Sequence, residues 1–257
     1  MFDSSQGHKR EIMAGKAALV TGGARRLGKD ISIALAQKGF DIVLNYNGSS
    51  PDIVAETARE IEKAGVRAYP VKADISKRNE VEAMFETVRK DIGYLDVLVN
   101  NAAIFEGIDF FDITEEFLDR FIGINLKGTI FCSQDAAKMM MEGDRKPGRI
   151  INIASLGGIE NWPKFIPYSV SKAGVIKFTK ILARKLAPDI LVNAIAPGTI
   201  VIEDDANETV DPNEVKKYPM KKFGKAQDMT SLINYLATEN EYITGHIFVV
   251  DGGRSLV

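Results

Sequence analysis

Short apolar stretches alternate with longer amphipathic stretches along most of the chain. Seven short stretches are rich in apolar and β-branched residues, as strands are, and they lie at residues 16–21, 41–46, 67–74, 95–103, 148–155, 189–198 and 245–253. Most lack a polar residue at every second position, which indicates strands buried on both faces. Because helical stretches separate them, the pattern predicts an α/β fold with a seven-stranded parallel sheet and helices on both faces.

The helical stretches are bounded by residues that commonly start and end helices. Helices are predicted over residues 27–38, 50–65, 76–93, 114–141, 168–187 and 226–238. Proline lies near the start of the second helix and glycine at its end, which is the usual asymmetry of helix ends. The longest helix, 114–141, contains Gly123 and Gly128.

The chain divides into an arm, one domain and one insertion. Residues 1–14 are polar and without period, and we expect a loose arm there. Residues 15–257 contain no repeat or linker and are predicted to form a single domain. Within it, residues 199–225 are acidic and then basic, without clear periodicity, and we expect a loop that covers the substrate.

Composition excludes several classes of protein. The chain has 257 residues, 26% of them charged, and a net charge of −2, so it lacks the basic excess of a nucleic-acid binder. One cysteine, Cys132, rules out an internal disulfide, and His8 and His246 lie too far apart to suggest a metal site. No apolar run approaches the roughly 18 residues of a membrane span, and no signal peptide is indicated. We expect a cytoplasmic protein without a metal.

Residues 21–30, TGGARRLGKD, lie between the first strand and the first helix and fit two phosphate-binding patterns. Counted from Gly23, the spacing to Gly28 and Lys29 is that of the phosphate loop of nucleoside triphosphatases. That loop needs a hydroxyl after the lysine to ligate magnesium, and Asp30 occupies the position. The triphosphatase interpretation is therefore disfavoured.

The second pattern is a dinucleotide-binding turn. Gly22 permits the tight turn, and Gly28 lets the following helix pack close to the sheet. The free amides at the helix start would then face a pyrophosphate. The turn lies in the first of several strand–helix units, which is the context that this motif requires, and a dinucleotide coenzyme is expected.

The end of the second strand bears on the choice of coenzyme. It reads Asn45, Tyr46, Asn47, with no carboxylate before Asp52 to bind ribose hydroxyls and repel a 2′-phosphate. Arg25 lies in the glycine turn and would face the same ribose. A guanidinium beside a neutral strand end favours a phosphate, so NADP(H) is preferred over NAD(H).

Candidate proton-transfer chemistry lies further along the chain. Tyr168 and Lys172 are four residues apart at a helix start and share one face. A neighbouring ammonium favours the phenolate, so we expect Lys172 to lower the pKa of Tyr168 and to suit it as a general acid or base. Ser155, at the end of the fifth strand, could hold the same substrate oxygen by a hydrogen bond.

Residues 15–253 resemble the classical short-chain dehydrogenase/reductase family. The motifs that carry the resemblance are TGGARRLG at 21–28, Asp74, NNAA at 100–103, Asn125, Ser155, Tyr168 with Lys172, APGTI at 196–200 and VDGG at 250–253. The resemblance implies a single-domain Rossmann fold with Asn125, Ser155, Tyr168 and Lys172 as catalytic tetrad. Tyr168 is the implied proton donor, Lys172 also binds the nicotinamide ribose, and Asn125 supports a water relay.

A coenzyme site follows from the same resemblance. Its implied members are Gly22, Arg25, Arg26, Leu27, Gly28, Asn45, Tyr46, Asn47, Asp74, Ile75, Asn101, Ala102, Ala103, Tyr168, Lys172, Pro197, Gly198 and Thr199. Asp74 would contact the adenine, although it could instead cap the helix that starts near Ser76. Thr199 would reach the carboxamide or the phosphates.

Arg26 departs from the family pattern, which commonly has glycine at this position. The sequence GARRLG resembles the pteridine-reductase-like branch, whereas YPMKKFGKAQDM at 218–229 and the APGTI segment are similar to 3-oxoacyl-acyl-carrier-protein reductases. An enoyl-reducing relative has a wider tyrosine-to-lysine spacing than Tyr168 and Lys172. Arg26 points to an extra anion contact over the pyrophosphate.

We therefore expect an NADPH-dependent reductase that converts a carbonyl to an alcohol, most like a 3-oxoacyl-thioester reductase. Its substrate would be a small molecule or an acyl thioester. A pteridine or dihydrofolate reductase is the alternative enzyme, and a catalytically silent NADP(H)-binding sensor or scaffold is the alternative of another class. The resemblance also implies a homo-oligomer, a tetramer or a dimer.

Overall fold

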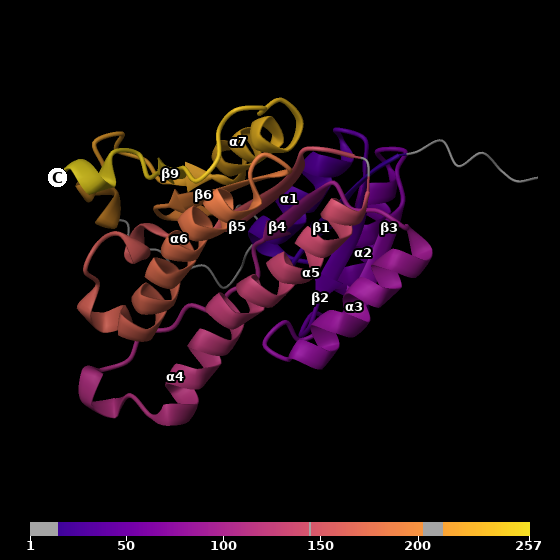
Figure 1. Cartoon of the computed structure of the whole chain (residues 1–257). Helices are drawn as coiled ribbons and strands as arrows, with labels where there is room; N and C mark the ends of the chain where they lie inside the picture. Colours follow the sequence, from indigo (N-terminus) through magenta and orange to yellow (C-terminus); the bar gives the residue numbers. More distant parts are fainter. Residues whose placement is uncertain (1–14, 144, 203–212) are drawn as a thin grey trace, which may run out of the picture.

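The structure, a computed structural model, describes residues 15–143, 145–202 and 213–257. Seven parallel strands form its main sheet, in the order β3-β2-β1-β4-β5-β6-β9 (Figure 1). They span β1 Lys16–Val20, β2 Phe40–Tyr46, β3 Ala68–Lys72, β4 Val97–Asn100, β5 Gly148–Ile153, β6 Ile190–Pro197 and β9 Ile247–Val250. The seven-stranded parallel sheet expected from the sequence is confirmed. The strand order reverses between β1 and β4, where ligands bind in such sheets.

Helices cover both faces of the sheet. They span α1 Arg26–Ala36, α2 Pro51–Glu62, α3 Arg78–Asp91, α4 Glu115–Phe121, α5 Thr129–Glu142, α6 Ile166–Leu186 and α7 Ala226–Thr238. Apolar side chains of α1, α2 and α7 pack into one core cluster and those of α3, α5 and α6 into another. No helix in the described ranges is long and apolar enough to cross a membrane.

The helix expected over residues 114–141 is interrupted. Between α4 and α5 the backbone winds as a π-helix over Ile122–Gly128, with Asn125 in its middle. Such a segment widens the helix and commonly marks a functional site. Gly128 has no room for a side chain, because a Cβ there would lie 2.7 Å from Ile75. The helical prediction was correct, but the change in winding was not foreseen.

The region expected to be a loop without regular elements contains a small second sheet. β7 Ile200–Val201 pairs in parallel with β8 Gly224–Lys225. Tyr218, between them, is buried. Residues 203–212 of the predicted loop and residues 1–14 of the predicted arm lie outside the described part of the chain.

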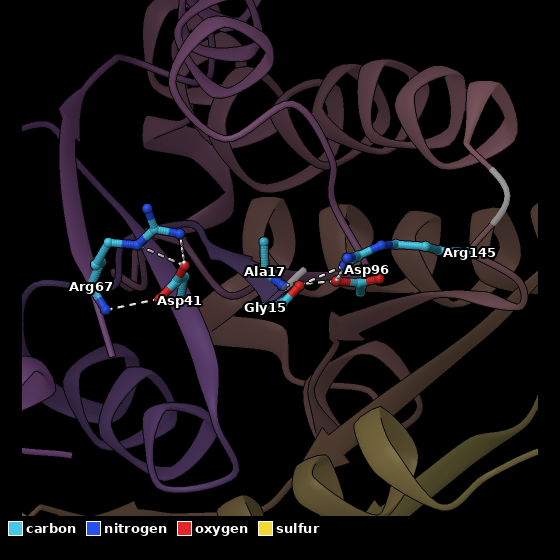
Figure 2. A network of polar contacts seen from close by, with 6 residues as sticks. All are labelled: Gly15, Ala17, Asp41, Arg67, Asp96 and Arg145. Atoms are coloured by element: carbon cyan, nitrogen blue, oxygen red, sulfur yellow. Dashed lines mark hydrogen bonds and ion pairs between the residues drawn. The ribbon is translucent and has the colours of Figure 1, made fainter. Parts of the chain in front are cut away.

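Two ion pairs hold the amino ends of the central strands (Figure 2). Asp41 at the start of β2 accepts hydrogen bonds from the backbone and the guanidinium of Arg67, at 2.8 Å and 2.5 Å. Asp96, just before β4, pairs with Arg145 at 3.3 Å, and Arg145 also donates to the Gly15 carbonyl at 2.6 Å. The entry of β1 is thus fixed by side chains of two neighbouring segments.

Removing the Asp96 carboxylate should destabilise the fold. Asp96 also accepts a hydrogen bond from the backbone N–H of Ala17 at 2.8 Å, and Ala17 is fully buried. Asp96→Ala leaves that donor without its partner, and the free energy of unfolding is expected to fall by about 2 kcal/mol in urea denaturation. The control is Glu142→Ala, whose carboxylate is in an exposed ion pair with Arg89; its effect should stay within about 0.5 kcal/mol. Equal effects of the two variants would contradict the prediction.

Candidate active site

A cleft of about 610 Å³ lies at the carboxyl ends of the strands. Its walls come from the segments that follow β1, β2, β3 and β4, where the strand order reverses. The predicted residues that line it are Gly22, Arg25, Arg26, Leu27, Gly28, Asn45, Tyr46, Asn47, Asp74, Ile75, Asn101, Ala102 and Ala103. Four segments that are distant in sequence therefore meet in one cleft of a size typical for ligands.

Some of the lining residues were not singled out from the sequence. They are Gly48, Ser49, Ala73, Ile104, Phe105, Glu106, Arg120 and Ile124. Residues 104–106 directly continue the NNAA segment after β4, so the rule that ligands bind at strand ends could have included them. Arg120 and Ile124 are four residues apart on the helical path before Asn125, and no local signal distinguishes them from other exposed helix positions.

The glycine turn is tied to both neighbouring strands. Gly22 has φ +62°, which favours glycine, and its N–H donates to Oδ1 of Asn45 at 3.2 Å. The Thr21 hydroxyl accepts from the backbone N–H of Asn101 at 2.9 Å. A Cβ on Gly28 would lie 2.0 Å from the Gly22 carbonyl oxygen, so only glycine permits this approach of α1 to the turn.

Arg26 adopts a strained backbone. Its φ is +51°, a left-handed conformation that costs a non-glycine residue roughly 1–2 kcal/mol. This explains why a glycine suits the position in the family pattern. Such strain persists where the surrounding structure or a function maintains it, and Arg26 is both the first residue of α1 and part of the cleft.

The polar side chains at the ends of β2 and β3 already make hydrogen bonds to other residues of the chain. Asn45 is buried and, besides accepting from Gly22, donates to the Ala73 carbonyl at 3.2 Å. Asp74 accepts from the N–H and the hydroxyl of Ser76, at 3.0 Å and 2.7 Å. Both residues line the cleft, but their side chains chiefly shape its wall. Asp74 closes the turn before α3 and does not cap the helix, whose N-cap is Lys77, and its contact with the adenine stays a prediction.

Ser155, Tyr168 and Lys172 come together beside the cleft. Ser155 lies two residues after the end of β5, and its Oγ accepts a hydrogen bond from Gly157 N–H at 3.0 Å. Tyr168 is in the first turn of α6. Lys172, one turn later, is buried, donates from Nζ to the Ile153 carbonyl at 2.7 Å and lies 5.9 Å from the centre of the Tyr168 ring. In this cluster Ser155 and Lys172 are buried and Tyr168 is partly exposed.

Burial controls the protonation of this cluster. It raises the pKa of Tyr168, and a hydrogen bond from Ser155 opposes the rise in part. Burial lowers the pKa of Lys172 to about 8. The expectation that Lys172 pulls the pKa of Tyr168 down is wrong for this structure, because desolvation of the phenolate dominates and raises that pKa. Tyr168 therefore remains a protonated phenol at neutral pH.

Lys172→Met should raise stability at neutral pH. The pKa of Lys172 falls from 10.5 to about 8 in the folded chain, so the unfolded state binds more protons between these values. The stability of the parent protein consequently rises with pH through this window and is lower below pH 8. The variant lacks this term but also loses the hydrogen bond to the Ile153 carbonyl, so its net advantage at pH 7 should be about 1–2 kcal/mol. This advantage should shrink by pH 10 in urea denaturation. A difference that is constant with pH would contradict the prediction.

The side chain of Asn125 holds the loop after β4. It is fully buried, accepts from Ile104 N–H at 2.9 Å and donates to the Ile104 carbonyl at 3.1 Å. Its amide also lies 3.1 Å from the Ser171 hydroxyl. The π-helical winding places Asn125 between this loop and α6. Its hydrogen bonds go to Ile104 and Ser171, and its assignment to a catalytic tetrad stays a prediction.

Pro197, Gly198 and Thr199 do not line the cleft. Gly198 N–H bonds to the Val250 carbonyl at 2.9 Å, and the Thr199 hydroxyl accepts from the Tyr218 hydroxyl at 2.9 Å. These residues lie at and just after the end of β6, on the far side of β5 from the glycine turn. Tyr168 and Lys172, which are also predicted to bind the coenzyme, are likewise not among the residues that line this cleft, so the assignment of Pro197, Gly198 and Thr199 to the coenzyme site stays a prediction.

Aromatic rings surround Tyr168, which the sequence did not indicate. Phe105 meets its ring edge-on at 4.7 Å between centroids and stacks on Phe165 at 4.5 Å. Trp162 lies parallel to the Tyr168 ring, at 6.5 Å and 12°. The phenol is thus held by rings on several sides, and Phe105 also lines the cleft.

The cysteine of the chain plays no part in the site. Cys132 is fully buried in α5, and burial raises its pKa to about 12, so it packs as an apolar group and does not act as a nucleophile. Within the residues that the structure describes, no group of three or more His, Cys, Asp or Glu side chains could hold a metal ion.

A family comparison accounts for the combination of glycine turn and tyrosine–lysine pair. Residues 22–255 match the family model described as enoyl-(acyl carrier protein) reductase. The chain belongs to the short-chain dehydrogenase/reductase family. The resemblance carried by the sequence motifs is confirmed, and with it an oxidoreductase of the NAD(P)-dependent kind.

Relatives of this chain match most of its length. The 3-oxoacyl-[acyl-carrier-protein] reductase FabG of Staphylococcus epidermidis is 37% identical over 246 residues, which cover 93% of this chain and 98% of that protein. A putative short-chain alcohol dehydrogenase from Sinorhizobium meliloti 1021 superposes with a TM-score of 0.88 at 34% identity, covering 95% of this chain and 98% of its own. A blue fluorescent protein from a metagenomic library, in complex with NADPH, gives 0.86 at 31% identity, with 93% and 98% covered.

Proposed function

We propose that this protein is an NADPH-dependent carbonyl reductase, most like a 3-oxoacyl-thioester reductase. The observation that carries the proposal is the cluster of the buried Ser155 and Lys172 with the partly exposed Tyr168, beside a cleft with a dinucleotide-type glycine turn. The FabG relative, a 3-oxoacyl-acyl-carrier-protein reductase, supports the substrate class.

The cleft fits a dinucleotide. Gly22 and Gly28 leave no side chain between the turn and the start of α1, whose free amides can face a pyrophosphate. Arg25 and Arg26 lie at the same place, and no carboxylate lines the cleft at the end of β2. When bound, the coenzyme would supply the hydride of the reduction.

The residues of the cluster would handle the proton. Because burial keeps Tyr168 protonated, its hydroxyl can donate a proton to the oxygen of a carbonyl under reduction. Ser155, which lies near enough to lower the pKa of Tyr168 in part, would hold the same oxygen. Lys172 would bind a ribose hydroxyl of the coenzyme, in exchange for part of its contact with Ile153.

A substrate panel tests the proposal. NADPH oxidation is measured with an acetoacetyl thioester, dihydrobiopterin, a crotonyl thioester and simple ketones or sugars. Turnover of the acetoacetyl thioester is the expected result. Turnover of dihydrobiopterin alone would contradict it and favour the alternative pteridine or dihydrofolate reductase, which the strained Arg26 in the cleft supports. NADPH binding without any turnover would favour a sensor or scaffold.

The preference for NADPH is tested by comparing kcat/KM with NADPH and NADH. Arg25 lines the cleft beside the neutral end of β2, where a 2′-phosphate would lie. Arg25→Ala is expected to lower the NADPH-to-NADH ratio about 10-fold, because a charge-assisted bond to phosphate is lost. An unchanged ratio would mean that residues other than Arg25 determine the preference for NADPH over NADH.

The remaining parts of the proposal concern organisation. Residues 15–257 would act as one domain, with residues 199–225 near the substrate, in a cytoplasmic protein. A homo-oligomer, dimer or tetramer, is supported by the exposed Val170 and Ile181 on α6, which are 55% and 57% accessible. Light scattering after size-exclusion chromatography tests the assembly.

A further inference from the structure

We propose that Glu160 is a positioning residue for the proton donor. It links the turn at the end of the chain, through Arg254, to Trp162, and so fixes the ring of Tyr168. The inference rests on the proposed function of Tyr168, but the link itself is a feature of the fold that can be measured without turnover.

One carboxylate serves two partners. Oε2 of Glu160 accepts the indole N–H of Trp162 at 2.8 Å, and Oε1 lies 3.8 Å from Nη1 of Arg254. The Glu160 and Arg254 side chains are only 22% and 25% exposed. An ion pair shielded to this degree is screened less by solvent than a surface pair. Arg254 therefore holds one carboxylate oxygen of Glu160, while the other oxygen orients the indole of Trp162.

Trp162 passes this constraint to the site. A Cβ on Gly157 would lie 2.6 Å from the Trp162 ring, so the indole lies against the backbone two residues after Ser155. The same ring is parallel to that of Tyr168. Trp162 thus lies against both the turn that carries Ser155 and the ring that carries the phenol. A shift of the indole would displace the two groups that must hold one substrate oxygen.

Arg254 is itself firmly placed. Asp251 accepts hydrogen bonds from the N–H groups of Gly253 and Ser255, at 3.0 Å and 2.7 Å, which closes the turn around Arg254. That turn packs on the end of β6, where a Cβ on Gly198 would lie 3.1 Å from Asp251. The turn after β9 therefore provides a fixed base from which Arg254 reaches Glu160.

Matched variants separate the two contacts of Glu160. Glu160→Gln keeps an acceptor for the indole N–H and loses the ion pair, whereas Glu160→Ala loses both. Arg254→Met removes the cation, and Arg254→Lys restores it. Glu142→Gln, in an exposed ion pair on α3 and α5, is the control. Trp162 is the one tryptophan of the chain, so its fluorescence reports this position directly.

For Glu160→Ala we expect red-shifted emission, stronger acrylamide quenching and a kcat about 10-fold lower, because small displacements of reacting groups are costly. The dissociation constant of NADPH should change less than about 2-fold, since none of these residues lines the cleft. Glu160→Gln and Arg254→Met should fall between Glu160→Ala and the parent, and Arg254→Lys should match the parent.

Several outcomes would overturn the inference. The inference fails if Glu160→Ala leaves both the Trp162 emission and kcat unchanged. It also fails if kcat falls while the emission stays the same, because the effect on catalysis would then not act through Trp162. If Glu160→Ala does not fold, Glu160→Gln and Arg254→Met decide by the same two measurements. If the parent turns over no member of the panel, the proposed function fails, whereas the emission series still shows whether Arg254 and Glu160 hold Trp162.

Discussion

Tyr168→Phe should lower kcat by about 10²- to 10⁴-fold, the usual contribution of a general acid. The variant removes one oxygen and keeps the ring that packs against Phe105 and Trp162. Stability and NADPH affinity should therefore remain close to those of the parent. Kinetics of NADPH oxidation with the best substrate of the panel, together with a fluorescence titration of NADPH, measure the two effects separately.

The pH dependence sharpens this prediction. The pKa of Tyr168 is raised above its usual value of 10.0, and reduction needs the protonated phenol. Activity should thus be present below that pKa and be lost as pH rises through it. In Tyr168→Phe the residual rate should lack this alkaline loss. Tyr242→Phe, at an almost fully exposed tyrosine, is the control and should behave as the parent. Full activity of Tyr168→Phe would refute the assigned role.

Gly28→Ala should impair coenzyme binding. The added methyl group would lie 2.0 Å from the Gly22 carbonyl oxygen and 2.7 Å from the Asn101 amide, so the turn and α1 must move apart. Overpacking of this kind costs about 1–3 kcal/mol, which is roughly 5- to 150-fold in a binding constant if the loss falls on the coenzyme. Calorimetric titration of NADPH measures the affinity, and thermal unfolding measures the cost to the fold.

Gly48→Ala is the matched control for this variant. Gly48 lines the same cleft, but a Cβ there would have no atom within 4 Å. The affinity of the Gly48→Ala variant for NADPH should differ from that of the parent by less than a factor of about 3. An equal loss in both variants would mean that the cleft tolerates no added methyl group. Unchanged binding in Gly28→Ala would remove the glycine turn from the coenzyme site.

The order of elements and the first binding turn could be predicted because their signals are local. Apolar runs such as that in β1 identify buried strands by their own composition, and Gly22 and Gly28 fit a turn between strand and helix. The pairing of Tyr168 with Lys172 follows from helical spacing alone. The interruption at Asn125 was less predictable, because a π-helical winding depends on what packs against it.

The hydrogen-bond partners of individual side chains could not be predicted in the same way. Asn45 and Asn125 look like ligand-binding amides in sequence, yet most of their hydrogen bonds go to the backbone of other strands and loops. Thr199 lies with Tyr218, nineteen residues further along, and not in the cleft. These partners are distant in sequence and become neighbours only after the sheet is assembled.

The sequence by itself determined the parallel α/β sheet, the dinucleotide-type turn and the placement of Tyr168 and Lys172 on one helix face, since each depends on residues within a few positions of one another. Only the tertiary structure decided the direction of the Tyr168 pKa, the aromatic surroundings of the phenol and the link from Arg254 through Glu160 to Trp162. Desolvation and long-range pairing are sums over all neighbours in space, and a linear pattern does not contain them.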